Sequence, residues 1–311
     1  MKLFSGNGNP AMACEMASRL KTKLGAIEVG RFSEGEIRVK INENVRGTDV
    51  FIIQSTCPPI NDNCMELLIM IDAFRRASAR RITAVIPFFA YARQDRKDQP
   101  RVPITAKLFA NLIEAAGADR VLTMDLHADQ IQGFFDIPLD HLSAVPVAVS
   151  YLKKKGLRNP VVASPDVGGI KDAWKFADSM GVPLAIVDKR RSGPVTTKVM
   201  NIIGEVRGRD VIIPDDMIAS GSSMVEAAEA LRRMGARDIY GFATHGIFSG
   251  PAVQRLVGSE LKEMAVTNTI PMTKEPASIR KPKITTISVA PLFAEAIHRI
   301  HEETSISALL H

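Results

Sequence analysis

Acidic residues follow three apolar stretches of strand length. Asp125 and His127 come after VLTM, Asp166 comes after VVASP, and Asp215 and Asp216 come after VIIP. Because α/β sheets bind ligands outside the carboxyl ends of their strands, we expect these groups to converge on one crevice. A single acid at a strand end is often only a helix cap. Three such ends indicate a site that binds a cation or the hydroxyl groups of a sugar.

A run of small residues joins the third of these strands to a helix. Residues 219–223 read Ala-Ser-Gly-Ser-Ser and precede the helical stretch MVEAAEALRRM. Free N–H groups and the dipole at a helix start bind phosphate, and serine hydroxyls can add hydrogen bonds. A serine-rich N-cap is the alternative interpretation. With Asp215 and Asp216 just before it, the loop indicates a sugar phosphate site.

The charge of the chain favours an anionic ligand. Its 40 Lys and Arg residues exceed its 34 Asp and Glu residues, which gives a net charge of +6 and a pI near 9.3. Nucleic-acid readers usually add a basic stripe or exposed aromatic residues. Here aromatic residues make up only 5%, and basic residues mostly alternate with acidic ones. We therefore expect small phosphorylated substrates and no nucleic acid.

The cysteines and the first residues indicate a cytoplasmic protein. Cys14, Cys57 and Cys64 form no CxxC pair, and an odd number gives no closed disulfide framework. The stretch MKLFSGNGNP lacks the long apolar run of an export signal. No later stretch is apolar for long enough to cross a membrane. We expect neither export nor a membrane contact.

The apolar patterns that position these residues alternate between strand and helix lengths. Runs such as 50–55 and 81–90 are each followed by a segment with helical spacing, which predicts an α/β fold with mostly parallel sheets flanked by helices. The length of 311 residues suits two domains. We place the first at 1–145, with the tail 302–311 packing on it, and the second at 146–301. Residues 91–103 and 189–197 are predicted to be loops.

A short internal echo favours duplication of one domain. GADRV at 117–121 and GARDI at 235–239 each follow a predicted helix and precede a predicted strand. The two halves can be related copies. Glycine at a helix end followed by a strand is also common in α/β proteins, so chance remains the alternative.

Several longer strings carry a specific resemblance. They are DLHADQIQGFFDIPLD (125–140), YARQD (91–95), NDNCMELLIMIDA (61–73), FSEGE (32–36), DKRR (188–191) and THGIFSGPA (244–252). Together they closely resemble the ribose-phosphate pyrophosphokinases, the family of phosphoribosyl pyrophosphate (PRPP) synthetases. The resemblance extends in order over essentially the whole chain.

The resemblance implies a fold and a reaction. The fold would be two tandem type I phosphoribosyltransferase-like domains. The enzyme would transfer the β,γ-diphosphate of ATP to the 1-hydroxyl of ribose 5-phosphate, giving PRPP and AMP for nucleotide biosynthesis. It would use Mg²⁺ and form homohexamers, which inorganic phosphate activates and ADP inhibits.

The resemblance also assigns residues by position. Catalytic residues would be Lys189 and Arg191. ATP would be bound by Phe32, Glu34, Gly35, Glu36, Arg93, Gln94 and Asp95. Ribose 5-phosphate would be bound by Arg191, Asp215, Asp216, Ala219, Ser220, Gly221, Ser222 and Ser223. The metal would be bound by His127 and Asp166, with Asp125, Asp136 and Asp140 as further metal-associated candidates. An allosteric anion site would use Arg46, Ser78, Arg101, Ser305 and Ser307.

Three departures from the family pattern leave alternatives open. The phosphate loop usually reads Asp-Thr-Gly-Gly-Thr, so Ala219 lacks the acid and Ser222 replaces a glycine. Glu34 stands where Asp or Asn is common, and Leu310 replaces a Phe. One alternative is a non-catalytic regulatory homologue. The other is a phosphoribosyltransferase that consumes PRPP, but such an enzyme would not need the YARQD and FSEGE elements.

Overall fold

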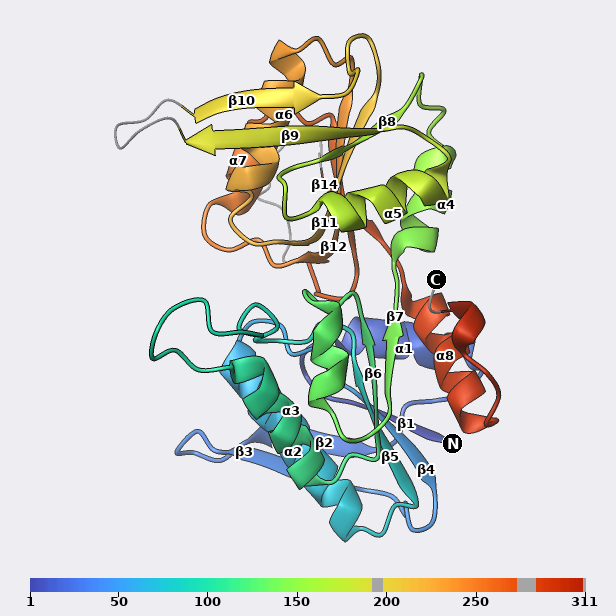
Figure 1. The fold of residues 1–311 in the computed structure, drawn as a ribbon. Coiled ribbons are helices and arrows are strands. Elements are labelled where there is room, and N and C mark those ends of the chain that lie inside the picture. The colour runs from blue at the N-terminus through green and yellow to red at the C-terminus, as the bar shows by residue number, and fades with distance from the viewer. Residues whose placement is uncertain (192–197, 273–283, 310–311) are drawn as a thin grey trace. The chain divides into compact units, whose positions relative to one another are not determined.

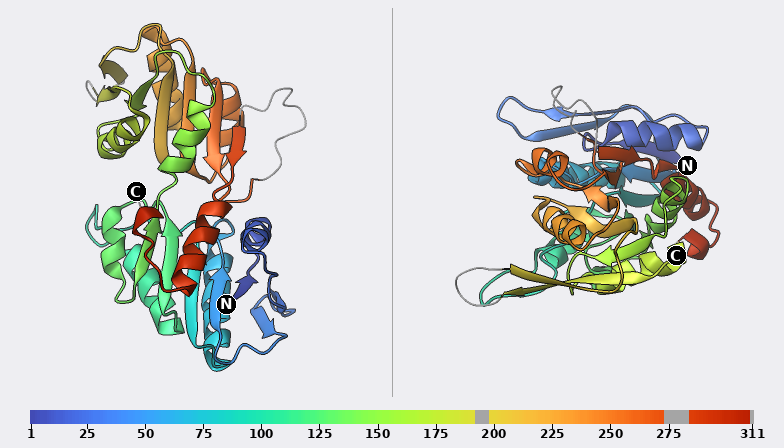
Figure 2. Two further views of the ribbon diagram at one scale, coloured as in Figure 1. Left: turned by 90° about the vertical axis from the view of Figure 1, so that its right-hand side faces the viewer. Right: turned by 90° about the horizontal axis from the view of Figure 1, so that it is seen from above.

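A computed structural model describes residues 1–191, 198–272 and 284–309, and for residues 189–191 and 198–200 it describes the backbone alone. The chain forms two compact units. Unit 1 comprises Met1–Ser143, Thr269–Pro271 and Ser288–His311, and unit 2 comprises Ala144–Asn268 and Met272–Ile287. Each has a sheet flanked by helices, so the predicted α/β class is confirmed (Figures 1 and 2).

The sheet of unit 1 is parallel throughout, with strand order β1-β4-β5-β6-β7. These strands are β1 (Lys2–Ser5), β4 (Asp49–Ile53), β5 (Arg81–Ile86), β6 (Arg120–Met124) and β7 (Leu139–Leu142). A separate antiparallel hairpin consists of β2 (Ile27–Arg31) and β3 (Ile37–Ile41). The helices are α1 (Pro10–Arg19), α2 (Ile60–Arg76), α3 (Thr105–Ala116) and α8 (Ala290–His301), with 3-10 turns at Asp129–Phe134 and Ser307–Leu309.

The sheet of unit 2 has the order β10-β9-β8-β11-β12-β13-β14. Its strands are β8 (Val161–Ser164), β9 (Leu184–Arg191), β10 (Lys198–Ile203), β11 (Val211–Ile218), β12 (Ile239–Gly246), β13 (Glu263–Thr267) and β14 (Ile284–Ile287). Only β10 runs antiparallel to its neighbour in this sheet. The helices are α4 (Val145–Lys153), α5 (Ile170–Met180), α6 (Ser222–Arg233) and α7 (Ala252–Val257).

The pattern of apolar residues explains the elements of unit 2. Strand β12 is buried along its whole length, as expected for a central strand of a parallel sheet. Helix α6 buries Met224, Val225, Ala228 and Leu231 on one face. These side chains join the strands in one apolar core. The core holds the carboxyl end of β11 and the start of α6 in place.

The C-terminal helix α8 corrects one predicted boundary. The sequence analysis placed residues 146–301 in the second domain, but α8 packs against α1 in unit 1. The Ser288 hydroxyl donates to Glu15 at 2.7 Å, and Arg81 donates to the carbonyl of Ile300 at 2.9 Å. The amphipathic pattern of α8 predicts that one face is buried, but not against which unit.

The two echoed segments occupy equivalent places in their units. Gly117 ends α3 and Gly235 follows α6, both with a positive φ. Strand β6 then pairs with β5, and β12 pairs with β11. The origin of both halves from one duplicated domain remains a prediction.

Candidate functional site

Three carboxylates lie near the carboxyl ends of β8 and β11, which are neighbouring strands of unit 2. Asp166 is exposed and follows β8, and its Oδ1 accepts a hydrogen bond from the N–H of Gly169 at 3.0 Å. Asp215 and Asp216 are half-buried and belong to β11 itself, which continues to Ile218. The expectation that β11 ends before these acids was therefore wrong. Pairing of Met217 with His245 of β12 extends the strand beyond them.

The charge state of Asp215 reflects its surroundings. Burial first, and then the negative charges of Asp216 and Asp166, together raise the pKa of Asp215 to about 8. The Asp216 N–H donates to Asp215 at 3.0 Å and opposes the shift only in part. A cation, or a ligand with several hydroxyl groups, would relieve this repulsion.

The loop at 219–223 has the shape expected of a phosphate cradle. Gly221 is the N-cap of α6 with φ +72, and α6 starts at Ser222. Gly221 has no side chain to cap this helix start, and the Ser222 N–H makes only a long hydrogen bond of 3.4 Å to the Ser220 Oγ. The first N–H groups can therefore face a ligand. Ser222 does not have a positive φ. The serine in place of glycine at 222 therefore adds no backbone strain, because the left-handed position is Gly221.

In unit 1, the stretch expected to bind adenine forms the tip of the β2–β3 hairpin. The Phe32 N–H donates to the Glu36 carbonyl at 2.8 Å, and Gly35 turns the chain with φ +99. Phe32 is 49% exposed, which is unusual for a large aromatic side chain. Glu34, Gly35 and Glu36 are exposed as well. A base can stack on such a ring.

The second stretch expected to bind the nucleotide lies in a loop without helix or strand, as predicted for 91–103. Arg93 and Gln94 are exposed. Gln94 contacts the start of α3, because its side chain accepts from Thr105 and its carbonyl accepts from the Ala106 N–H. Asp95 accepts from Gln130 at 2.7 Å. These contacts hold the loop while Arg93 stays exposed.

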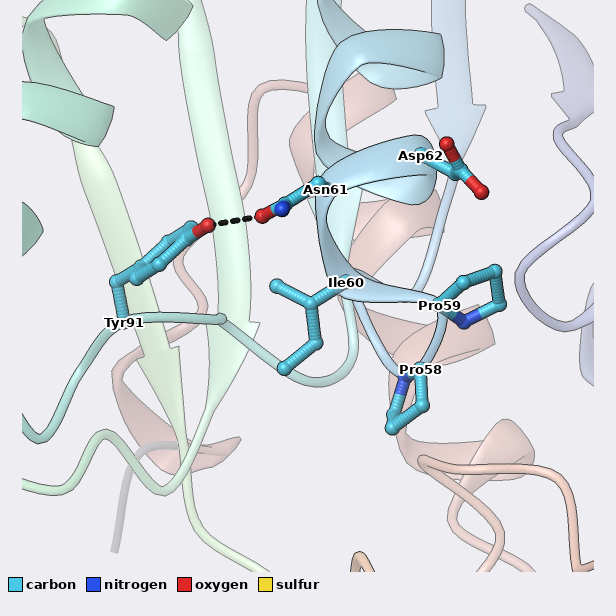
Figure 3. A pocket seen from close by; sticks show the side chains of 6 residues that line it. All are labelled: Pro58, Pro59, Ile60, Asn61, Asp62 and Tyr91. Carbon is cyan, nitrogen blue, oxygen red and sulfur yellow. Dashed lines mark hydrogen bonds between the residues drawn. The ribbon is translucent and has the colours of Figure 1, made fainter.

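A pocket of about 520 Å³ lies beside Tyr91, at the start of the second stretch (Figure 3). It is lined by Pro58, Pro59, Ile60, Asn61, Asp62 and Tyr91. The Tyr91 hydroxyl, two residues before Arg93, bonds to Asn61. Asp62 forms an ion pair with Arg31 at 2.9 Å, and Arg31 also donates to the Gly35 carbonyl. None of the predicted site residues lies in 61–73, because the ion pair joins segments far apart in the chain.

Comparisons with known proteins agree with this geometry. Residues 1–117 match the N-terminal domain of ribose phosphate pyrophosphokinase, and residues 190–311 match the phosphoribosyl synthetase-associated domain. The chain is 55% identical to "Ribose-phosphate pyrophosphokinase" of Clostridium acetobutylicum, over 99% of this chain and 97% of that protein. It is 54% identical to the Vibrio parahaemolyticus protein of the same name, over 100% and 99%. The chain belongs to the ribose-phosphate pyrophosphokinase family.

A solved structure supports the fold of this member of the ribose-phosphate pyrophosphokinase family. Phosphoribosylpyrophosphate synthetase from Mycobacterium smegmatis matches with a TM-score of 0.90 and 44% identity. The match covers 97% of this chain and 99% of that one. The predicted fold class and the resemblance that implied it are confirmed.

The metal-associated candidates of the family are divided between the two units. His127 is exposed and Asp125 half-buried, and both follow β6 in unit 1, whereas Asp166 belongs to unit 2. Asp140 is buried and forms an ion pair with Arg120 at 2.6 Å near the starts of β7 and β6. Its charge is thus already neutralised, and we remove it from the metal candidates. Asp136 is exposed, and its N–H donates to Glu114.

The described residues hold no group of three or more His, Cys, Asp and Glu side chains that could bind a metal by themselves. They also include no helix that is long and apolar enough to cross a membrane. The acidic ends of β8 and β11 belong to neighbouring strands of one sheet, whereas β6 belongs to the sheet of unit 1, so the convergence of all three ends on one crevice stays a prediction.

The structure gives side-chain positions for the allosteric candidates but only the backbone for the catalytic candidates. Lys189 and Arg191 lie at the end of β9, paired with β10, so they were wrongly predicted to belong to a loop; their side chains lie outside the description. Residues 192–197 and Leu310 lie outside the described residues. Arg46, Ser78 and Arg101 are exposed, and the hydroxyl of Ser305 donates to that of Ser307 at 3.2 Å.

Proposed function

We propose that this chain transfers the β,γ-diphosphate of ATP to the 1-hydroxyl of ribose 5-phosphate and releases PRPP and AMP. The observation that carries the proposal is a helix start without a side-chain cap, next to an acid pair, in a chain similar over its full length to enzymes named for this reaction. The backbone N–H groups of 220–223 would bind the 5-phosphate, and Asp215 and Asp216 would bind the ribose hydroxyls.

Two alternatives receive less support. A non-catalytic homologue would not need the acid pair, and the relatives described above are named for the pyrophosphokinase activity. A phosphoribosyltransferase that consumes PRPP would not need the exposed ring of Phe32 or the loop around Arg93.

The donor set of unit 2 fits Mg²⁺. Mg²⁺ prefers oxygen and usually takes one or two carboxylates together with water and substrate phosphates, so a cluster of three protein ligands is not needed. Asp166 is exposed and adds to the negative charge that raises the pKa of Asp215. We propose Asp166 as the main ligand and His127 as a second, less typical one. When bound, the ion would neutralise charge on the phosphate oxygens.

Diphosphoryl transfer needs no covalent protein nucleophile. It needs an in-line approach of the sugar oxygen to the β-phosphorus and stabilisation of the charge that develops on phosphate oxygens. Asp215 and Asp216 would orient the sugar. Lys189 and Arg191 would place positive charge on the transferring group, and Phe32 and Arg93 would hold the nucleotide.

We also propose the family's homohexamer, with an anion site for activating phosphate built from Arg46, Ser78, Arg101, Ser305 and Ser307. Guanidinium groups and hydroxyls are suitable donors for phosphate. Activity measured at fixed magnesium should rise with inorganic phosphate, and light scattering should give a mass above the monomer. A flat response and a monomeric mass would contradict this part. A cytoplasmic location also remains a proposal.

The reaction is tested by a coupled assay of AMP release from ATP and Mg²⁺, with and without ribose 5-phosphate. We expect AMP only with ribose 5-phosphate, together with an equal amount of PRPP. No AMP, or AMP independent of the sugar, would reject the proposed activity.

A further inference from the structure

The segment after β12 supports the phosphate loop through its carbonyl groups. The Ile218 carbonyl accepts from the N–H groups of Ile247 and Phe248 at 3.0 and 3.1 Å. The Ala219 carbonyl accepts from the Ser249 N–H at 3.0 Å. Because these carbonyls are bound on this side, the loop has a fixed backbone shape before any ligand arrives.

Arg255 of α7 completes this support with a side chain. Its Nη1 donates to the Ser220 carbonyl at 2.5 Å and to the Ser222 Oγ at 2.9 Å. Leu256, the next residue, lies under Gly221, where a Cβ would be 3.4 Å from its Cγ. One residue of α7 therefore packs beneath the loop, and its neighbour bonds to the loop on both sides of Gly221.

The guanidinium of Arg255 has N–H groups that make no hydrogen bond to the loop. It carries five N–H groups, and both hydrogen bonds to the loop are donated by Nη1. Within the described part of the chain, Nε and Nη2 have no hydrogen-bond partner, and Arg255 is exposed. Two parallel N–H groups on a guanidinium match the oxygens of a phosphate. Ala219 brings no carboxylate to the loop that could neutralise this charge.

We propose that Arg255 is a phosphate-binding residue of the ribose 5-phosphate site, which holds residues 220–222 in shape and adds a positive charge for the 5-phosphate. The inference rests on the proposed function, because it assigns the phosphate to this loop. It predicts that Arg255 acts on substrate affinity and leaves the chemical step unchanged.

The test compares Arg255→Ala, Arg255→Gln and Arg255→Lys at saturating ATP and Mg²⁺. The Ala and Gln variants should raise the KM for ribose 5-phosphate about tenfold, with kcat within about twofold. The Lys variant should recover most of the affinity, because it keeps the charge. Arg233→Ala is the matched control, since Arg233 is an exposed arginine at the far end of α6; its KM should not change.

Several results would overturn the inference. An unchanged KM in Arg255→Ala, or a fall in kcat at constant KM, would reject a role in phosphate affinity. A Gln variant equal to the parent would reject the need for charge. Thermal unfolding midpoints within about 2 °C of the parent would show that the variants are folded. A variant that fails this check is replaced by Ser222→Ala, which removes one acceptor of Arg255 and should raise the KM about threefold.

A second measurement separates this inference from the proposed function. Calorimetry with ribose 5-phosphate and Mg²⁺, without ATP, reports binding alone. If the parent protein releases no AMP, the proposed reaction fails, but weaker binding to Arg255→Ala than to the parent would still support the role of Arg255. Equal binding by both would reject it.

Discussion

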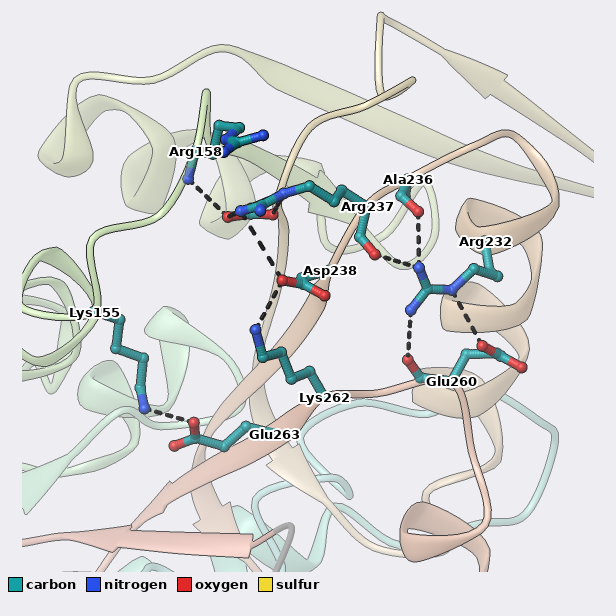
Figure 4. Close-up of polar contacts among 10 residues, drawn as sticks. Lys155, Arg158, Arg232, Ala236, Arg237, Asp238, Glu260, Lys262 and Glu263 are labelled. Carbon is teal, nitrogen blue, oxygen red and sulfur yellow. Dashed lines mark hydrogen bonds and ion pairs between the residues drawn. The ribbon is translucent and has the colours of Figure 1, made fainter.

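The pKa values of the acids at the two ends of β11 are shifted in opposite directions. Asp210, just before the strand, is 1% exposed. Arg237, labelled in Figure 4, donates two hydrogen bonds of 2.7 and 2.5 Å to it. Burial acts to raise the pKa of Asp210, but the Arg237 bonds and the Arg158 N–H lower it below its usual value. Asp215, five residues later, has carboxylates as charged neighbours, and its pKa rises to about 8.

The difference shows where the sheet is built for stability and where it is built for binding. At the amino ends of β11, β12 and β13, acids and bases neutralise one another, as when Lys262 binds Asp238 at 2.8 Å. At the carboxyl end of β11, like charges stay together. Clusters of this kind cost stability and are typical of binding sites.

The largest effect is expected at the carboxyl end. Asp215→Asn should lower kcat/KM for ribose 5-phosphate about a thousandfold, because an amide cannot replace a charged acceptor for sugar hydroxyls. Steady-state assays check this. The ligand-free protein should meanwhile become more stable to urea at pH 7, since a strained acid is removed. If Asp215→Asn lost stability and kept its activity, Asp215 would act in stability and not in binding.

Next come the cations of β9. Lys189→Ala or Arg191→Ala should lower kcat about a hundredfold and leave the KM for ATP within a few-fold, because their charge is expected to act on the transition state. Initial rates over a range of ATP concentrations measure both constants. A large rise in KM at constant kcat would assign these side chains to nucleotide binding instead.

At the amino end, the expected effect is on stability. Arg237→Ala should lower the free energy of unfolding by about 2 kcal/mol, because it leaves Asp210 charged and buried. Asp210→Asn should cost about 1 kcal/mol, since Arg237 is 37% exposed and can reach water. Urea unfolding measures both, and KM and kcat of the folded variants should stay unchanged. Equal losses of unfolding free energy in Arg237→Ala and Asp210→Asn would contradict the expectation that removing the arginine costs more.

The pH dependence should have opposite signs at the two ends. The folded pKa of Asp210 lies below its unfolded value, so its stabilisation is present above about pH 4 and is lost as pH falls. The folded pKa of Asp215 is raised to about 8, so stability falls as pH rises from about 4 to 8. Both trends should be measured in metal-free buffer. In acid, the loss of unfolding free energy caused by Asp210→Asn should shrink by about 1 kcal/mol. Toward pH 8, the gain of unfolding free energy from Asp215→Asn should grow. Penalties independent of pH would refute this.

The smallest effect concerns the missing loop acid. Ala219→Asp should raise the KM for ribose 5-phosphate about threefold, because it places negative charge near the 5-phosphate. Ala219→Asn is the neutral control of the same size and should leave the KM unchanged. Adding Ser222→Gly should bring no relief of strain, since Gly221 is the residue with positive φ. A lower KM in the Asp variant would show that the acid organises the loop.

Local patterns in the sequence determined much of this protein. Apolar runs predicted the strands and helices, and the order of strand, small residues and helix predicted the phosphate loop at 219–223. These features depend on residues close together in the chain, where backbone geometry links position to direction. The strings at 32–36, 91–95 and 125–140 were long enough to identify the family.

Only the tertiary structure decided which distant residues meet. Asp140 resembled a metal candidate until its pairing with Arg120 neutralised it, and α8 resembled part of the second domain until it packed on α1. Arg255 bonds to a residue 35 positions earlier, and Asp62 bonds to Arg31. Such contacts depend on how the strands are ordered in each sheet, and the spacing of residues along the chain does not contain that order.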